Sequence, residues 1–490
     1  MLATLLLLLL LIAAAQTANI QFFRAPALDA SPLNPRVSSS STQFARGEIL
    51  GADGTILAES IPQGSTWQRV YPLGSLTSGV VGFSSTGYGN WALEAQYNNY
   101  LSAHAQPAQS FAQVLAPTSA ADSITLTLQP ALQKIARTAM GGQDGAAVVL
   151  DPRSGAVLGM YSNPNFNPAP IVSTNYATAS AAWKLITTKN AHGFPPLGLV
   201  ATQQTFPPGS TFKVVTTAAA VVGRPDLVTK KYHIGAFTKL PQSNKLLYNS
   251  GGSPCGGTVA QMLPPSCDPG YALLGLDEGA DLLSSTANSF GFNATPPLDL
   301  PGVAASYFPD AASFAQNLPG LAYSAIGQEN VRASALQDAL IAAAIADGGS
   351  IMVPHLLSSV TAPDGSVVRR FLATLWKQPL NPFQAGQIVP LMQNVVRYGT
   401  ASGIFLAIDD VAAKTGTAQT GNAKQNTDDW MIAFAPATHP TVAVAVVMPF
   451  QDVSNFGATV AGPIVKCLIE GALAIQAGQR PTGTPTTCPG

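Results

Sequence analysis

Two short segments of this chain place hydroxyl and lysine side chains at spacings that suit nucleophilic chemistry. The first is PPGSTFK at 207–213, which contains the only S-x-x-K of the sequence, Ser210 to Lys213. The prolines and the glycine cannot continue a helix backwards, and an apolar, Ala-rich run follows, so we expect a helix that begins near Ser210. Residues three apart share one helix face, which places Lys213 beside Ser210.

A serine hydroxyl needs a base within hydrogen-bond reach to act as a nucleophile, and Lys213 can be that base only when neutral. At an ordinary lysine pKa, only about one side chain in 2,500 is neutral at pH 7. Burial and a second nearby cation would raise that fraction. The alternative interpretation is that Ser210 merely caps a helix that carries a lysine.

The second segment is Lys414-Thr415-Gly416-Thr417, the only K-T-G of the chain. It follows an apolar stretch and precedes a polar loop and the strand-like run at Trp430, so it predicts an edge strand of a sheet. A lysine and two threonines along such a strand can hold a substrate carboxylate, and Gly416 leaves room for the substrate backbone. The alternative is a turn at a strand end. Lys414 could also be the second cation that lowers the pKa of Lys213.

A third segment, Ser266-Cys267-Asp268, lies between the other two. The order S-x-x-K, S-x-N, K-T-G is the motif set of β-lactamases and penicillin-binding proteins, and Asp268 stands where that set has Asn. An ionised Asp cannot donate a hydrogen bond to a substrate. It also raises the pKa of Lys213, which opposes the use of that lysine as a base. We therefore expect acylation that is retained but weakened.

The elements that must position these residues indicate an α+β fold. The apolar runs Ala146–Leu150 and Ala156–Tyr161 predict a β-hairpin, and Trp430–Ala435 and Thr441–Met448 predict two more strands. The sequence between these two groups is largely helical in pattern, most clearly at Leu336–Ala346. Strands at both ends of a domain with helices between them predict one antiparallel sheet packed against a helical cluster.

The chain divides into four predicted parts: a membrane anchor or signal peptide at 1–23, a smaller mixed non-catalytic domain at 24–144, a catalytic domain at 145–478 and a disordered tail at 479–490. The apolar run Leu2–Ala15 reaches the length of a membrane span when it is extended through Phe23. A cleaved signal peptide is the alternative. No basic residue precedes the run, so the true start could lie upstream. Either way, we expect the bulk of the chain outside the cytoplasm.

Composition argues against several other classes of protein. Charged residues make up 10% of the chain, the formal net charge is −1 and no basic stripe occurs, which argues against a nucleic-acid partner. The four cysteines form no C-x-x-C pair and the five histidines form no metal-spaced cluster, so we expect no metal and no cofactor. Cys255 and Cys267 could form a disulfide in an oxidising compartment or remain two small apolar residues.

Over nearly its whole length the chain resembles class B penicillin-binding proteins, most nearly their actinobacterial PbpA-type branch. The segments that carry the resemblance, beyond the three motifs, are Arg46-Gly47-Glu48-Ile49 with Gly54, Leu57 and Ala58, Gly145–Asn167, Ile326-Gly327-Gln328, Gly348-Gly349 and Pro354-His355-Leu356. The first of these segments resembles the family's non-catalytic, dimerisation-like domain and the second resembles the start of its transpeptidase domain. The resemblance therefore implies a penicillin-binding transpeptidase fold with an N-terminal anchor in the cell membrane.

The resemblance also implies a role for each motif residue. Ser210 would attack the penultimate D-Ala carbonyl of a donor stem peptide, and Lys213 would take its proton. Ser266 would relay a proton to the leaving D-Ala, with Asp268 beside it. Lys414, Thr415, Gly416 and Thr417 would bind the terminal carboxylate, and the backbone N–H groups of Ser210 and Thr417 would form the oxyanion hole. An acceptor amine would then resolve the acyl-enzyme and create a cross-link.

The implied partners are stem peptides of lipid II-derived strands, β-lactams that trap Ser210, the membrane, and a separate glycosyltransferase of the division or elongation machinery. Three alternatives remain. A D,D-carboxypeptidase would use water as the acceptor, and a catalytically weak or inactive scaffold or sensor would be explained by Asp268. A β-lactamase is disfavoured, because no E-x-x-L-N follows Ser266 and the N-terminal domain would be superfluous.

Overall fold

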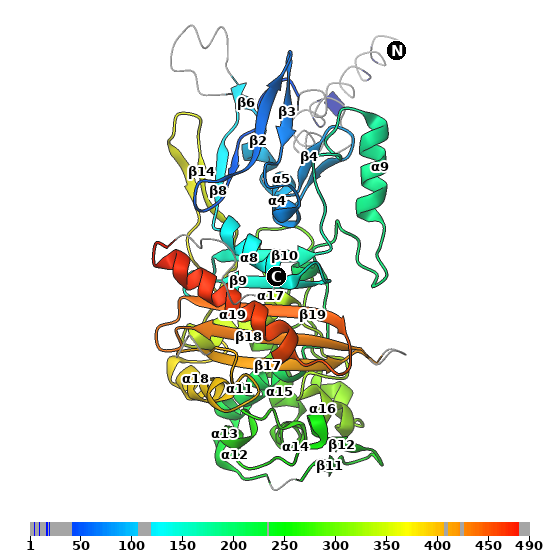
Figure 1. The fold of residues 1–490 in the computed structure, drawn as a ribbon, viewed down its shortest axis with the longest axis vertical. Helices are drawn as coiled ribbons and strands as arrows, with labels where there is room; N and C mark the ends of the chain where they lie inside the picture. Colours follow the sequence, from blue (N-terminus) through cyan, green and yellow to red (C-terminus); the bar gives the residue numbers. More distant parts are fainter. Residues whose placement is uncertain are drawn as a thin grey trace.

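The computed structural model describes residues 42–105, 119–232, 235–405, 410–421 and 426–479, with five isolated positions near the N-terminus. The described part of the molecule is elongated, with the strands of residues 49–70 at one end and the three motifs in the other half (Figure 1). The predicted anchor at 1–23 and the predicted tail at 479–490 lie outside the described residues, apart from those isolated positions and Gln479.

A six-stranded sheet with the order β15-β14-β8-β1-β2-β3 forms the N-terminal end. Its strands are β1 (Ile49–Leu50), β2 (Ile56–Gln63), β3 (Thr66–Val70), β8 (Ser123–Leu126), β14 (Leu357–Thr361) and β15 (Val367–Arg370). Burial alternates along β8, as expected for a strand with one face on the core. The hairpin β14–β15 comes from far along the chain, so this end of the molecule is completed by residues that follow the helical region (Figure 1). The predicted division at 144/145 stays a prediction.

Buried ionic contacts hold the N-terminal end together. The Glu94 carboxylate accepts from Arg46 Nη2 at 2.8 Å and Arg69 Nε at 2.6 Å, and Tyr71 donates its hydroxyl to the same carboxylate at 3.1 Å. The Glu94 side chain is fully buried and both arginines are nearly so. Burial alone would raise the pKa of Glu94, but the two guanidinium groups outweigh it and lower that pKa. Glu94 is therefore a buried carboxylate whose ionisation depends on its two partners.

The other half of the molecule is built on a five-stranded antiparallel sheet with the order β10-β9-β19-β18-β17. Its strands are β9 (Gly145–Leu150), β10 (Val157–Asn163), β17 (Ala412–Gln419), β18 (Thr427–Ala435) and β19 (Val442–Gln451). Every residue of β9 and β18 is buried, as the apolar runs predict for strands covered on both faces. The predicted α+β fold is confirmed, and β17, which carries the K-T-G motif, is the edge strand.

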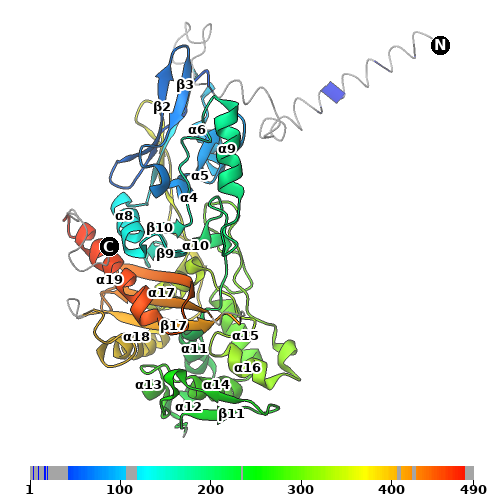
Figure 2. The same ribbon diagram turned by 45° about the vertical axis from the view of Figure 1, so that its right-hand side comes forward.

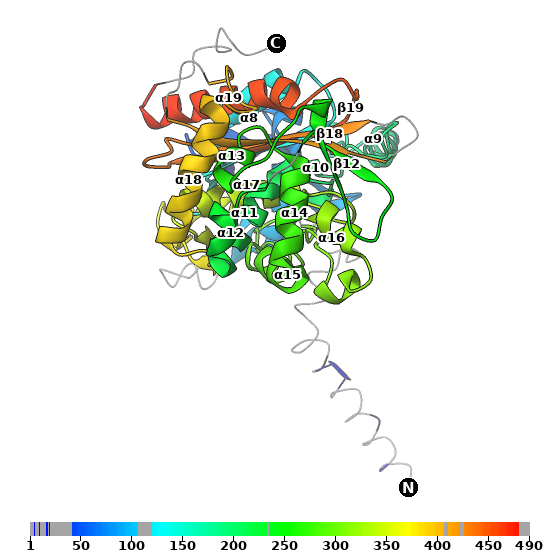
Figure 3. The same cartoon turned by 90° about the horizontal axis from the view of Figure 1, so that it is seen from below.

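Helices cover both faces of this sheet (Figure 3). Helix α19 (Gly457–Gln476) packs on β18 and β19 and against α8 (Pro130–Met140), which packs on β10. Helix α17 (Ala335–Ala346), the predicted Leu336–Ala346 helix, packs on the other face against β9, β18 and β19. Helix α11 (Lys213–Gly223) lies beyond it, against α14 (Asp268–Glu278), α15 (Ala280–Ser289) and α18 (Pro382–Arg397). The active-site helices therefore sit on the α17 side of the sheet.

The remaining elements surround these two sheets. They are η2 (Gly74–Leu76), α4 (Ser78–Val81), β4 (Phe83–Ser85), β5 (Gly89–Trp91), α5 (Leu93–Gln96), α6 (Asn98–Leu101), β6 (His104–Ala105), β7 (Ser119–Ala120), α9 (Tyr176–Thr187), α10 (Val200–Gln203), η3 (Gly209–Phe212), α12 (Pro225–Thr229), β11 (Phe237–Lys239), β12 (Leu246–Tyr248), η4 (Ser250–Gly252), α13 (Val259–Met262), η5 (Ala311–Phe314), α16 (Leu318–Ser324), β13 (Ile351–Met352) and β16 (Leu375–Lys377). Helix α9 stands beside the N-terminal strands, with Trp183 stacked on Tyr88 (Figure 2).

Among the described residues, one helix is long and apolar enough to cross a membrane, and it is α19. Half of its most apolar stretch is buried, and the helix packs against β18, β19 and α8. Its apolar character is therefore that of a core helix.

Candidate active site

The turn that carries Ser210 is the 3-10 segment η3, which leads directly into α11 at Lys213. The predicted helix thus begins where expected, but its first turn is tighter than an α-helix. Gly209 has φ +55°, and a Cβ at this position would lie 3.1 Å from the Cβ of Ala418 in β17. The glycine therefore provides both the left-handed backbone and the close approach to the K-T-G strand. We call residues 207–212 the nucleophile turn, after the role expected of Ser210.

Two contacts from distant segments fix the start of this turn. Trp430 in β18 donates its indole N–H to the carbonyl oxygen of Pro207 at 2.9 Å, and Gly209 donates its N–H to the carbonyl oxygen of Gly327 at 2.9 Å. Gly327 has φ +73°, and a Cβ there would come within 2.1 Å of the Gly209 carbonyl oxygen. The Ile326-Gly327-Gln328 segment therefore acts as a backbone support for the nucleophile turn.

Lys213 is fully buried and its ammonium group meets three acceptors. Nζ lies 2.7 Å from the carbonyl oxygen of Ser266, 3.2 Å from Ser266 Oγ and 2.6 Å from Asp268 Oδ1. These contacts use all three N–H donors of a charged lysine. Burial lowers the pKa of Lys213, and the Asp268 carboxylate opposes that shift. Lys213 is thus easier to deprotonate than an exposed lysine, and Asp268 holds its proton in place.

Lys414, on β17, contacts the same serine. Its Nζ donates to Ser266 Oγ at 2.8 Å and to the carbonyl oxygen of Thr415 at 2.9 Å. Burial lowers the pKa of Lys414 well below its ordinary value, and the positive charge of Lys213 adds to that effect. The Ser266 hydroxyl therefore bridges two buried lysines, an arrangement that can pass a proton between them.

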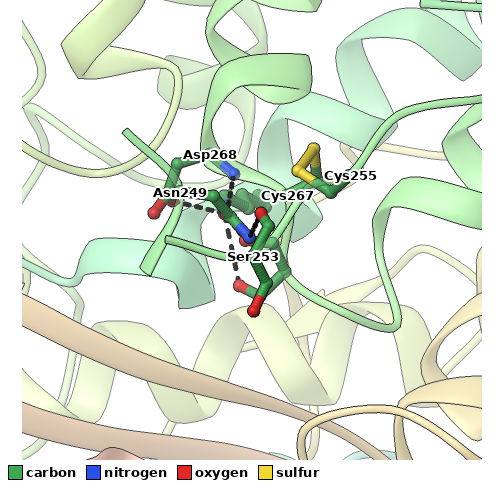
Figure 4. The surroundings of a disulfide bond; sticks show 7 residues. Asn249, Ser253, Cys255, Cys267 and Asp268 are labelled. Carbon is green, nitrogen blue, oxygen red and sulfur yellow. Dashed lines mark hydrogen bonds and ion pairs between the residues drawn. A yellow bond between two sulfur atoms is a disulfide. The ribbon is translucent and has the colours of Figure 1, made fainter. Parts of the chain in front are cut away.

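The backbone of the Ser266-Cys267-Asp268 segment is fixed by a covalent bond and a hydrogen bond (Figure 4). Cys267 is buried and forms a disulfide with Cys255, so the first of the two alternatives for these cysteines is correct. The Asp268 N–H donates to Asn249 Oδ1 at 3.0 Å. Ser266 itself has φ +59°, an unusual value for a serine. The disulfide and Asn249 thus hold the segment that presents Ser266 and Asp268 to Lys213.

The two threonines of the K-T-G strand are engaged with neighbouring elements. Thr415 Oγ1 shares a hydrogen bond with Thr400 Oγ1 at 2.6 Å, and Thr417 Oγ1 accepts the N–H of Gly457 at 3.0 Å. A Cβ on Gly416 would lie 2.8 Å from the carbonyl oxygen of Pro208. The space left by Gly416 is therefore occupied by the nucleophile turn in this structure.

The structure thus brings Lys213, Ser266, Asp268 and Lys414 into direct contact, with the Ser210 turn lying against Gly416 and Ala418. The sequence assigned no supporting role to Asn249, the Trp430 indole or Gly327. The one signal among them was that Gly327 lies in a segment that resembles the family. Among the described residues, no three His, Cys, Asp or Glu side chains gather to hold a metal ion.

Replacing Asp268 by Asn is expected to increase the rate of acylation by penicillin several-fold at neutral pH. If Lys213 is the base, as the sequence leads us to expect, it acts in its neutral form, so the rate should rise with pH through the pKa of Lys213. Removing the Asp268 charge lowers that pKa further, so the rise moves to lower pH. Fluorescent-penicillin kinetics from pH 5.5 to 9 would measure the shift, with Asp226→Asn as control, because Asp226 pairs with Arg224 on the surface. A slower Asp268→Asn enzyme would contradict the expectation.

Comparison with known proteins places this geometry among related chains. The penicillin binding protein transpeptidase domain model matches residues 145–470, and the penicillin binding protein A dimerisation domain model matches residues 46–122. The peptidoglycan D,D-transpeptidase PbpA of Mycobacterium tuberculosis is 33% identical over 476 residues, which cover 92% of this chain and 94% of the relative.

Solved structures of penicillin-binding proteins are also similar to this chain. The ceftriaxone acyl-enzyme complex of M. tuberculosis penicillin-binding protein A superposes with a TM-score of 0.78 at 31% identity, over 88% of this chain and 99% of the other. The D,D-transpeptidase domain of a peptidoglycan glycosyltransferase from Eggerthella lenta gives a TM-score of 0.76 at 30% identity, over 89% and 99% of the two chains. The likeness therefore extends over both halves of the molecule.

Proposed function

The chain belongs to the penicillin-binding-protein transpeptidase family, and from this premise we propose that Ser210 is the nucleophile of a peptidoglycan D,D-transpeptidase. The chain is a peptidoglycan D,D-transpeptidase that binds penicillin. The observation that carries the assignment of its residues is the Ser266 hydroxyl between Lys213 and Lys414, next to the turn of Ser210.

Acylation begins with the transfer of the Ser210 proton to Lys213. Buried Lys213 is deprotonated more readily than an exposed lysine, because desolvation disfavours its charged form. Ser210 Oγ then attacks the penultimate D-Ala carbonyl of the donor stem peptide. The Ser210 and Thr417 backbone N–H groups stabilise the oxyanion, a contribution of about 2.7–4 kcal/mol for one such donor.

The leaving D-Ala needs a proton on its nitrogen. Ser266 donates it and is reprotonated from Lys213 or Lys414, both of which contact its hydroxyl. Lys414, Thr415 and Thr417 bind the terminal carboxylate, with the threonine hydroxyls turning from Thr400 and Gly457 to the substrate. An acceptor amine then attacks the acyl-enzyme carbonyl carbon. The ester bond to Ser210 Oγ breaks as the peptide bond of the cross-link forms, and the proton lost by the amine returns to Ser210.

A slow penicillin-binding scaffold is the second candidate, and the observation that favours it is the Lys213–Asp268 ion pair at 2.6 Å. The carboxylate stabilises the protonated form of the base, which is the form that cannot accept the Ser210 proton. Substrate turnover by the wild-type chain separates the two candidates.

We also propose where the enzyme is located and which enzyme it works with. Residues 1–23 anchor the chain in the membrane with the catalytic domain outside the cytoplasm, as the apolar run Leu2–Ala15 supports. A disulfide next to the active site suits an oxidising compartment. A separate glycosyltransferase polymerises the glycan strands that this chain cross-links.

The proposed nucleophile is tested by mapping the penicillin adduct. Incubation with penicillin G is expected to add the mass of one penicillin to the intact protein, and peptide mapping is expected to place it on Ser210. Protein denatured before incubation is the control and should remain unmodified. An adduct on any other serine would overturn the assignment of Ser210, and the absence of an adduct would overturn the proposed chemistry.

A further inference from the structure

A buried carboxyl group, Asp338, lies directly behind the nucleophile turn. Asp338 is on α17, is fully buried and places Oδ2 2.7 Å from the hydroxyl of Thr211, the residue that follows Ser210. The same Thr211 hydroxyl lies 3.0 Å from the carbonyl oxygen of Pro208 at the start of the turn. Asp338 therefore contacts the nucleophile turn through a single hydroxyl group.

The number of protons available for these two contacts decides the charge of the Asp338 carboxyl group. Thr211 Oγ1 carries one proton, whereas the Pro208 carbonyl oxygen can only accept. Both short contacts are hydrogen bonds only when Asp338 is protonated and donates to Thr211, which in turn donates to Pro208. If Asp338 is ionised, it takes the Thr211 proton, and Pro208 keeps only the longer contact with the Thr211 N–H at 3.4 Å.

The surroundings of Asp338 also disfavour its ionised form. Its second oxygen, Oδ1, has no hydrogen-bond partner among the described residues, and a buried carboxylate oxygen without a donor is costly. Helix α17 packs against β9, β13, β18, β19, α10 and α18, and these elements carry three ionisable side chains, Asp428, Asp429 and Arg397. None of the three pairs with Asp338. Burial raises the pKa of Asp338 to about 7, against the opposing effect of the Thr211 hydrogen bond.

We propose that Asp338 is a positioning residue for acylation, which in its protonated form donates to Thr211 and so lets Thr211 hold the Pro208 end of the nucleophile turn. The inference rests on the proposed role of Ser210. It predicts that the Thr211 hydroxyl donates to the Pro208 carbonyl oxygen below neutral pH and that this hydrogen bond is lost above neutral pH. With a pKa of about 7, roughly nine-tenths of Asp338 is protonated at pH 6 and about 3% at pH 8.5.

The test is the second-order rate of acylation by fluorescent penicillin, measured from pH 5.5 to 9 for wild type, Asp338→Asn, Asp338→Leu and Asp347→Asn. Asn mimics the protonated acid because its N–H can donate to Thr211 at every pH. Asp338→Asn is therefore expected to equal wild type at pH 6 and to be about fivefold faster at pH 8.5, the effect of one hydrogen bond. The ratio of the two rates cancels the titration of Lys213, which both proteins share.

The other two variants are controls. Asp338→Leu cannot donate and is expected to be slow at every pH. Asp347 lies at the end of the same helix, and its pKa is also raised, to about 6, but it has no contact with the nucleophile turn. Asp347→Asn is expected to follow the wild-type profile.

Thermal unfolding is a second readout. The folded pKa of Asp338 lies above its unfolded value. The contribution of Asp338 to wild-type stability is therefore largest below about pH 4, decreases between about pH 4 and pH 7, and stays constant above that. Asp338→Asn should lack that fall. A rate ratio that is constant with pH would overturn the role of Asp338 alone, whereas wild type that labels at no pH would overturn the proposed function and this inference with it.

Discussion

Replacing Lys213 by Met is expected to slow acylation by penicillin about a thousandfold, within the range that a general base contributes. Met fills much the same volume in the buried site but can take no proton from Ser210. The three contacts of Nζ with Ser266 and Asp268 are lost as well. Lys414 cannot substitute readily, because its Nζ is held by Ser266 and by the Thr415 carbonyl oxygen.

Lys213→Arg separates the loss of a base from the loss of a charge. Arg retains the positive charge beside Asp268 but does not deprotonate in proteins, so it should be nearly as slow as Met. The wild-type rate rises with pH through the lowered pKa of Lys213, and both variants should lose that rise.

The measurement is the second-order rate with fluorescent penicillin, with Ser210→Ala as the zero-reaction blank. Lys230→Met is the matched control, because Lys230 also pairs with an aspartate, Asp277, but on the surface. It should remain within twofold of wild type, and circular dichroism should show that all variants are folded. A Lys213→Met enzyme within fivefold of wild type would show that the Ser210 proton goes elsewhere.

Replacing Glu94 by Gln is expected to destabilise the N-terminal end by about 3–5 kcal/mol, the cost of breaking a buried ion pair by removing one partner. The amide that replaces the carboxylate is neutral, so Arg46 and Arg69 would remain buried and charged without a counter-ion. One guanidinium nitrogen, Arg69 Nη2, already lacks a partner among the described residues. The loss of the Glu94 carboxylate therefore leaves the buried charges of Arg46 and Arg69 uncompensated.

The same carboxylate gives a pH dependence of stability. The folded pKa of Glu94 lies below its ordinary value, so the stabilisation is complete above the unfolded pKa and is lost as pH falls through the folded one. Wild type should therefore lose stability in acid, and Glu94→Gln should lose less.

Guanidinium unfolding monitored by circular dichroism would measure the effect, and penicillin labelling in parallel would report on the catalytic half. Glu48→Gln, at an exposed position beside Arg46, is the matched control and should change stability by less than about 0.5 kcal/mol. An equal unfolding midpoint for Glu94→Gln and wild type would show that the ionic contacts of Glu94 make no net contribution to stability.

Local patterns were sufficient to predict the fold class and the parts of the site that lie close together in the chain. The buried strands β9, β18 and β19 follow from uninterrupted apolar runs, and α17 follows from its length and its terminating Asp347-Gly348-Gly349. The start of a helix at Ser210 follows from the two prolines and the glycine before it. The resemblance to penicillin-binding proteins placed the same residues in their functional order.

Local spacing could not predict the supporting contacts, because they join residues that are distant in sequence. The Lys213–Asp268 pair, 55 residues apart, was expected only from the order of the three motifs, and the Thr211–Asp338 pair, 127 residues apart, was not expected. The sequence left the Cys255–Cys267 bond as one of two alternatives, and it offered no sign that Arg46 and Arg69 share the carboxylate of Glu94.

By itself, then, the sequence determined which side chains are expected to carry the chemistry, because a helix turn and an extended strand set the spacing of neighbours through local backbone geometry. Only the tertiary structure decided the protonation of those side chains. Burial and the few partners within hydrogen-bond reach set the pKa values of Lys213, Lys414 and Asp338, and those partners come from elements that meet only when the sheet and its helices are packed.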